Sequence, residues 1–266
     1  MCQFKSGIIL KDRVFVPDYD SHTDMLTELG IKDDYIGASK KFVRAELIPQ
    51  NGDVFTDIET WRFKVDQDIT PDWFNPEEYR PRMIEAVKEW AKDHIHIGVD
   101  GLKISSGTDH YIKDCKDVEI CGSASIKYVC GSASIENVCG SASIENVCGS
   151  ASIKYVCGSA SIKYVRGSAS IENVCGSASI ENVCGSASIE NVCGSASIKY
   201  VCGSASIKYA KGQAVICSSA YSRWERSHSL ILCENATFKD NYGRVIYQSG
   251  DYKLVSVERG KEIGNG

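Results

Sequence analysis

Hydrophobic and polar positions recur with a fixed period through the middle of the chain. Residues 121–210 are ten tandem copies of a nine-residue unit, C-G-S-A-S-I-x-x-V, in which x-x is Lys-Tyr or Glu-Asn. Small and apolar residues alternate with Cys and Ser, which is the two-residue period of a β-strand. Gly, Ser, Ile and Val are mediocre to poor helix formers, and no copy contains proline. This pattern predicts a β-solenoid.

The alternation also predicts which side chains face the core. Val, Gly, Ala and Ile are expected to point inward, whereas Cys and both Ser of each unit point outward. The pair Glu136-Asn137 and its equivalents then form the corner between strands. A bulge at Gly122 and its equivalents would instead turn the thiols inward, and the pattern leaves that alternative open.

Charged residues at the first variable position indicate how many repeats form one coil. If residues eighteen apart stack, one column alternates in sign without exception and contains Lys127, Glu145, Lys163, Glu181 and Lys199. The other column has a single like-charge step. Strands in neighbouring coils lie about 4.8 Å apart, where opposite charges attract and like charges repel. We therefore predict a coil of two repeats, or eighteen residues.

The segments on either side of the repeats lack this period. Residues 1–100 predict a small α+β domain, with strands at 4–10, 14–16, 42–48 and 60–65 and helices at 21–29 and 77–94. Alternation within 42–48 places Glu46 on the opposite side of its strand from Val43, Ala45 and Leu47. We expect a connector with an irregular first coil at 101–120, the solenoid at 121–219 and a β cap at 220–266, because solenoid ends expose strand edges that need covering.

Composition narrows the classes of function. The chain has 266 residues and a net charge of −5, and no basic patch stands out, so we expect no nucleic-acid partner. It has neither a membrane-length apolar run nor a signal-peptide pattern, which predicts a cytoplasmic protein without a membrane partner. The 13 cysteines are then expected to be free thiols. No nucleotide-binding or metalloprotease motif is present, and no cofactor is predicted.

The stacked cysteines are the first candidate chemical feature. An eighteen-residue coil aligns five of them in an unbroken file of Cys121, Cys139, Cys157, Cys175 and Cys193. The second file has Arg166 in its centre. Thiolates favour soft metal ions such as Cu(I) or Zn²⁺, so the unbroken file is a candidate metal ladder. The alternatives are small apolar packing residues or stacked disulfides.

Serine files on the same faces are the candidate contact surface. They include Ser123, Ser125, Ser141, Ser143, Ser159 and Ser161. Solenoids bind partners along extended faces, so these files predict a protein partner or self-association. Ice or crystal-surface binding is a weaker alternative, because Ser lacks the methyl group of Thr.

Two further groups of residues carry chemical alternatives. Removal of Met1 would expose Cys2 as an amino-terminal nucleophile, with Asp18, Asp20, Ser21 and His22 as orienting groups. Gln3 follows Cys2 where that chemistry favours a small residue, so a structural role for Cys2 is the simpler interpretation. His94 and His96 form a His-x-His pair that could bind Zn²⁺ with a third ligand, but a polar helix end is the simpler interpretation.

The repeat G-S-A-S-I-K-Y-V resembles repeats of uncharacterised bacterial and phage-encoded β-solenoid proteins with a small amino-terminal domain. The opening M-C-Q-F-K-S-G-I-I-L and the segment D-Y-D-S-H are similar to the start of those proteins. The resemblance implies the architecture but no activity and no catalytic residues. Near-uniform Cys at the first repeat position departs from that group, whose first position is mixed.

These observations favour a non-catalytic structural or interaction protein that presents a rigid solenoid with regular Cys and Ser files. The alternatives from other classes are soft-metal binding by the cysteine ladder and an amino-terminal nucleophile hydrolase that uses Cys2.

Overall fold

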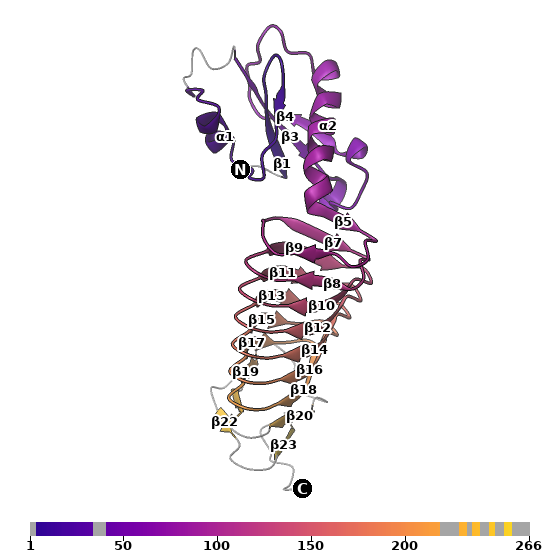
Figure 1. Cartoon of the computed structure of the whole chain (residues 1–266), viewed down its shortest axis with the longest axis vertical. Helices are drawn as coiled ribbons and strands as arrows, with labels where there is room; N and C mark the ends of the chain where they lie inside the picture. The colour runs from indigo at the N-terminus through magenta and orange to yellow at the C-terminus, as the bar shows by residue number, and fades with distance from the viewer. Residues whose placement is uncertain are drawn as a thin grey trace. The chain divides into compact units, whose positions relative to one another are not determined.

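The computed structural model describes residues 4–33, 41–218, 229–232, 236–239, 245–247 and 253–256. The chain divides into two compact units, Met1–Ile95 and His96–Gly266, and each is described by itself. The amino-terminal unit is α+β, and the second unit is a β-solenoid (Figure 1).

The amino-terminal unit is built on a four-stranded antiparallel sheet in the order β2-β1-β3-β4. Its strands are β1 (Lys5–Ile9), β2 (Val14–Phe15), β3 (Val43–Ile48) and β4 (Arg62–Val65). Short 3₁₀ turns η2 (Gln50–Gly52) and η3 (Ile58–Thr60) connect β3 to β4. These strands lie where the alternation of apolar residues predicted them.

Two helices cover opposite faces of this sheet. Helix α1 (His22–Glu28) begins at Ser21, whose hydroxyl accepts a hydrogen bond from the Asp24 N–H. It packs Met25 and Leu26 against Ile8. Helix α2 (Pro76–His94) packs Tyr79 against Ile9, the next residue along β1, whose side chain points to the other face. Both faces of the sheet are therefore buried.

The solenoid contains two parallel sheets that share the ten repeats. In Figure 1 odd- and even-numbered strands are each stacked one above another in sequence order. The repeat strands are β9 (Ser125–Cys130), β10 (Ser134–Val138), β11 (Ser143–Val147), β12 (Ser152–Val156), β13 (Ser161–Val165), β14 (Ser170–Val174), β15 (Ser179–Val183), β16 (Ser188–Val192), β17 (Ser197–Val201) and β18 (Ser206–Ala210).

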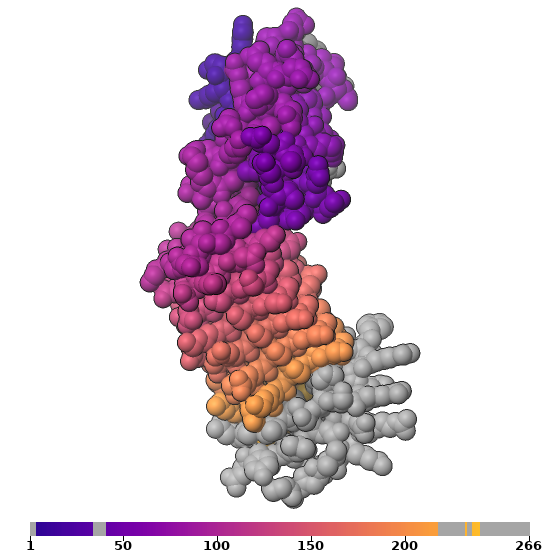
Figure 2. Space-filling model, turned by 90° about the vertical axis from the view of Figure 1, so that its right-hand side faces the viewer, coloured from indigo at the N-terminus to yellow at the C-terminus, as the bar shows by residue number. Residues whose placement is uncertain are grey.

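The strand register confirms the eighteen-residue coil. Ser134 pairs with Ser152 and Ile135 with Ile153, and the same eighteen-residue offset continues through the repeats. Two strands make one coil, so the ten strands make five coils, whose layers form the ridges visible in Figure 2. The β-solenoid predicted from the sequence is confirmed.

The corner of each coil lies elsewhere than predicted. Chain direction changes at Gly131-Ser132 and its equivalents, where every repeat glycine has a positive φ, such as 67° at Gly131. Only glycine adopts this conformation without strain, so the glycine marks a turn and not an inward strand position. The prediction that Glu136-Asn137 forms the corner is wrong: both residues lie within β10. Strand pairing skips Glu136, and Ile135 and Val138 both face the core.

The core is correspondingly simple. Ala, Ile and Val of every repeat are almost fully buried and form one continuous cluster through the coils. The turn glycines stack so closely that a Cβ atom built on Gly158 would lie 3.1 Å from the Gly140 nitrogen. Each coil therefore requires glycine for two reasons, its backbone conformation and its contact with the coil before.

The solenoid begins with shorter, less regular strands: β5 (Ile95–Ile97), β6 (Lys103–Ile104), β7 (His110–Lys113) and β8 (Val118–Ile120). Their pairing with β9 and β10 contains register shifts. Asp114 has a positive φ of 54° at one of these turns, and its carboxylate accepts hydrogen bonds from the Ser132 N–H and hydroxyl. A carboxylate thus stabilises a turn that glycine forms in the repeats.

At the other end, β19 (Val215–Ser218), β20 (Ser229–Leu232) and β21 (Thr237–Lys239) continue the parallel stacking. The last strands of the two sheets, β22 (Val245–Tyr247) and β23 (Lys253–Ser256), pair antiparallel with β21 and β20. The charged segment 221–226, predicted to cap the solenoid, lies outside the described residues.

Candidate functional site

The outward side chains of β9, β11, β13, β15 and β17 form a surface that we call the odd-strand face. The second Ser of each repeat lies half-buried along it, beginning with Ser125, Ser143 and Ser161. The next file contains the alternating charges Lys127, Glu145, Lys163, Glu181 and Lys199. These two files line a groove of about 620 Å³ that crosses all five coils.

Charges on this face interact between coils. The Lys127 ammonium lies 3.6 Å from the Glu145 carboxylate, and Lys163 lies 3.9 Å from the same residue. On the even-numbered strands, Lys154 is 3.1 Å from Glu136 and Lys208 is 3.4 Å from Glu190. Each ion pair is partly exposed, so we expect it to contribute less than about 1 kcal/mol. Their arrangement therefore matters more for recognition than for stability.

The second variable position forms a file of alternating aromatic and amide side chains. Along the odd-strand face it reads Tyr128, Asn146, Tyr164, Asn182, Tyr200. Tyr128 and Tyr200 are about 40% exposed, which is a large exposure for side chains on a sheet face. On the even-numbered strands the same position carries two adjacent asparagines, Asn173 and Asn191. The odd-strand face is thus the more regular of the two.

The repeat cysteines lie at the turns and not along the middle of the sheets. Those of both files are half-exposed and are free thiols, including the unbroken file of Cys121, Cys139, Cys157, Cys175 and Cys193. The first Ser of each repeat, such as Ser123, Ser141 and Ser159, is exposed in the same turns. The predicted contact serines therefore divide between the odd-strand face and the turns.

Neighbouring thiols influence one another along each file. Burial, followed by the charge of Cys157 and Cys121, raises the pKa of Cys139 above its usual range. Burial and the charge of Cys193 raise the pKa of Cys175 in the same way. Each file therefore disfavours ionisation of several adjacent thiols together, unless a cation compensates the charge.

The second file differs at Cys148, which lies between Cys130 and Arg166. A hydrogen bond from Cys130, together with the charge of Arg166, lowers the pKa of Cys148 to about 7, while the pKa of Cys130 is raised. The Arg166 guanidinium also lies 4.6 Å from the centre of the Tyr164 ring and donates a hydrogen bond to Asn146. The hydrogen bond from Cys130 is the larger of the two causes that lower the pKa of Cys148, and the charge of Arg166 adds to it.

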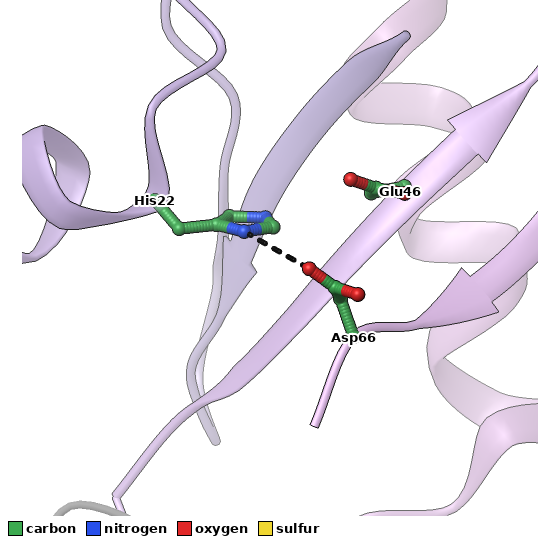
Figure 3. Close-up of side chains that lie close together, drawn as sticks. All are labelled: His22, Glu46 and Asp66. Atoms are coloured by element: carbon green, nitrogen blue, oxygen red, sulfur yellow. Dashed lines mark ion pairs between the residues drawn. The ribbon is translucent and has the colours of Figure 1, made fainter. Parts of the chain in front are cut away.

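A separate polar cluster lies in the amino-terminal unit and consists of His22, Glu46 and Asp66 (Figure 3). His22 is the first residue of α1, Glu46 lies on β3 and Asp66 directly follows β4. One ligand atom from each residue lies within 4.8 Å of the other two. The Nδ1 atom of His22 is 3.8 Å from an Asp66 oxygen, and Glu46 is fully buried.

Lys64 provides positive charge beside this cluster. Its Nζ atom lies 2.9 Å from Asp66 and 3.4 Å from Glu46. The hydrogen bond from Lys64 lowers the pKa of Asp66, and burial lowers the pKa of His22. The cluster therefore combines a neutral imidazole with ionised Asp66 at neutral pH.

The other groups proposed around Cys2 have separate roles. Asp20 accepts hydrogen bonds from the Lys5 ammonium and the Ser6 N–H, and Asp18 lies 3.5 Å from His94. Cys2 itself lies outside the described residues. The hydrolase interpretation stays a prediction.

The His-x-His pair does not converge on one point. The His94 ring stacks on Trp90, and its Nδ1 lies 2.8 Å from the Trp90 carbonyl oxygen. The His96 ring instead stacks on His110, with nitrogen atoms 3.5 Å apart. The two side chains thus take part in different contacts, as a polar helix end and a histidine stack.

Sequence patterns missed Glu46 and Asp66. Alternation within β3 places Glu46 on the other side of the strand from Val43, Ala45 and Leu47, and α1 covers that second face of the sheet. Only tertiary packing brings Glu46 to His22, so no local signal marks the cluster.

Comparison of the chain with known protein families, with curated proteins and with solved structures gave no match. The resemblance to other nonapeptide-repeat solenoids stays a prediction. Among the described residues, no helix is both long enough and apolar enough to cross a membrane.

Proposed function

We propose that this protein is a non-catalytic structural and interaction protein whose solenoid associates with a second copy through the odd-strand face. The observation that supports this proposal is the groove across five coils, lined by charges of strictly alternating sign. A partner surface must repeat at the coil spacing of about 4.8 Å to pair with every charge. A second copy of this chain meets that requirement.

Symmetry specifies how two such faces pair. A two-fold axis parallel to the strands keeps each file opposite its own copy and reverses the order of coils. With an offset of one coil, Lys127 lies opposite Glu181 of the second copy and Glu145 lies opposite its Lys163. The same offset places Tyr128 opposite Asn182 and Asn146 opposite Tyr164. Every charged pair is then complementary, and tyrosine, a residue enriched in interfaces, contributes apolar area.

The test is sedimentation equilibrium of the full chain under reducing conditions, at low and high salt. We expect the wild type to associate and salt to weaken the association, because exposed charge pairs are screened. The double variant Glu145→Lys/Glu181→Lys gives the odd-strand face five lysines and is expected to be monomeric.

The matched control is Glu172→Lys/Glu190→Lys, which makes the same change in net charge on the even-numbered strands. Circular dichroism establishes that both variants retain the solenoid. Association of the control but not of the odd-strand variant supports the proposal. A monomeric wild type, or equal association of both variants, contradicts it.

Soft-metal binding is the second candidate function, and the electrostatic contact between adjacent thiols favours it. A Cu(I) ion bridging two stacked thiolates would supply the positive charge that ionisation of the file requires. Titration with Cu(I) should occupy the unbroken file first and be reduced by Cys157→Ser at its centre. Unchanged reactivity of the repeat thiols after Cu(I) addition would exclude this candidate.

A further inference from the structure

We infer that His22, Glu46 and Asp66 bind a divalent transition-metal ion. This site belongs to the amino-terminal unit, so the inference is independent of the function proposed for the solenoid. Donor atoms at about 2.1 Å from a tetrahedral ion lie roughly 3.4 Å from one another. The 3.8 Å between His22 and Asp66 therefore closes to ligand geometry with a small side-chain movement. Figure 3 shows the imidazole directed toward Asp66, with the Glu46 carboxylate nearby.

The surroundings of His22 favour the form that binds metals. Its Nε2 atom lies 3.3 Å from the carbonyl oxygen of Ala45, which can only accept a hydrogen bond. Nε2 must therefore carry the proton, which leaves the lone pair of Nδ1 facing Asp66. Metal-ligating histidines typically donate their second ring N–H to a carbonyl in this way, which fixes the orientation of the ring.

A buried carboxylate needs compensation, and Glu46 is completely buried. Lys64 compensates Glu46 and Asp66 in this structure, but its side chain is 31% exposed and can turn into solvent. A bound cation would take over the role of the Lys64 ammonium. We therefore expect Lys64 to compete with the ion for the two carboxylates.

An independent observation comes from Ser6, which lies directly opposite Glu46 in the pairing of β1 with β3. Its hydroxyl is fully buried and, within the part of the chain that the structure describes, makes no hydrogen bond. Buried polar atoms without a partner are rare and often mark the place of an ion or a water molecule. Because paired residues of two antiparallel strands place their side chains on the same face of the sheet, we expect the Ser6 hydroxyl to support a ligand or an ion-bound water.

The donor set indicates the class of ion. One imidazole nitrogen with two carboxylates suits Zn²⁺, Co²⁺, Mn²⁺ or Fe²⁺, whereas Ca²⁺ and Mg²⁺ favour oxygen ligands alone. Three protein ligands leave a fourth position for water.

Co²⁺ is the appropriate probe, because its absorption separates this site from the repeat thiols. Thiolate ligands add strong near-ultraviolet charge-transfer bands, whereas nitrogen and oxygen ligands give only weak visible bands. We expect the full chain, kept reduced, to bind one Co²⁺ ion without charge-transfer absorption. Glu46→Gln is expected to weaken this binding at least tenfold, because loss of a group that only supports a ligand already costs about 10- to 100-fold in metal affinity.

Two variants make the result decisive. Asp33→Asn removes one carboxylate charge from the same unit, at the exposed pair with Arg44, and should leave Co²⁺ affinity unchanged. Lys64→Met removes the competing ammonium and should tighten binding, which keeps the test valid if Glu46→Gln fails to fold. The inference would be overturned if neither the wild type nor Lys64→Met binds a Co²⁺ ion whose spectrum lacks thiolate charge-transfer bands. Equal affinity of folded Glu46→Gln and wild type would overturn it as well.

Discussion

The two units use the same kind of ion pair in different surroundings. In the amino-terminal unit, Lys5 lies 3.0 Å from Asp20, is 1% exposed and lies over the ring of Trp90. In the solenoid, Lys154 lies 3.1 Å from Glu136 but is 45% exposed. The distances are nearly equal, so the difference between the pairs is hydration. The Lys5 ammonium is a buried charge that occurs once, whereas the charges of the solenoid are repeated and hydrated.

The largest expected effect on stability comes from breaking the Lys5–Asp20 pair, and breaking the Lys154–Glu136 pair is the comparison. Asp20→Ala leaves the buried Lys5 ammonium without its carboxylate, and we expect a loss of about 3 kcal/mol in the free energy of unfolding. Glu136→Ala leaves Lys154 in contact with water and should cost less than about 1 kcal/mol. Urea unfolding measures both values. Tryptophan fluorescence reports mainly on the amino-terminal unit, which holds three of the four tryptophans (Trp61, Trp73 and Trp90), and circular dichroism follows the solenoid. Equal costs would show that hydration does not distinguish the pairs.

Glycines with positive φ provide the next comparison. Gly158 and Gly30 both have φ of 67°, but a Cβ atom on Gly158 would meet Gly140, whereas a Cβ atom on Gly30 has no atom within 4 Å. Gly30→Ala should cost about 1 kcal/mol from backbone strain alone. Gly158→Ala adds crowding between coils, and we expect a cost of about 2 kcal/mol or more. Thermal unfolding of the two variants tests this order, and a smaller effect at Gly158 would contradict the close stacking of turns.

A smaller effect is expected from the charge columns. Glu172 and Glu190 are the one like-charge step between neighbouring coils. The charge exchange Glu190→Lys/Lys208→Glu makes that column alternate throughout, so it should stabilise the solenoid by a few tenths of a kcal/mol. Glu145→Lys places a lysine between Lys127 and Lys163 and should destabilise it by a similar amount. The opposite signs are the test, and chemical denaturation at low salt measures them. Identical shifts in both variants would mean that neighbouring coils do not sense each other's charge.

The prediction with the smallest effect on stability concerns the thiols, whose alkylation rates should differ in their dependence on pH. Because the pKa of Cys148 is about 7, its alkylation by iodoacetamide should reach half its maximal rate near pH 7. Cys130 and Cys139, whose pKa values are raised, should react only at higher pH. All three lie in tryptic peptide 128–154, so fragmentation of that peptide compares them directly.

Arg166→Gln supplies the control for this prediction. Loss of the guanidinium should move the alkylation midpoint of Cys148 to higher pH, since the positive charge favours the thiolate. Stability should change little, because Arg166 is exposed. An unchanged midpoint would show that Arg166 does not influence the thiol.

The sequence was sufficient to predict the solenoid because every repeat carries the same order of small, apolar and polar residues. Residues eighteen apart are opposite in charge at every step but one, and this alternation distinguishes an eighteen-residue coil from a nine-residue coil. The alternation pattern misplaces the corner, because it predicts a turn between the two inward residues Ile135 and Val138. In the structure both residues lie in one strand, and both face the core. A positive φ at glycine is a backbone property, and an alternation pattern of side chains does not contain it.

The amino-terminal cluster had no comparable signal. The sequence offers His22 only as an orienting group for Cys2, and the alternation along β3 does not predict the burial of Glu46. Its burial depends on α1 packing against the second face of the sheet, which is a contact between segments far apart in sequence. A residue used once leaves no period to detect.

The antiparallel strands β22 and β23 have a consequence for assembly beyond the chain itself. Parallel coils with identical edges could add to one another indefinitely, as the layers of a fibril do. Among the described strands, the last one of each sheet runs against the direction of the coils, so a second molecule presenting its first coil in the same sense meets a reversed edge. End-to-end growth is thereby interrupted, and the number of repeats determines the length of the solenoid.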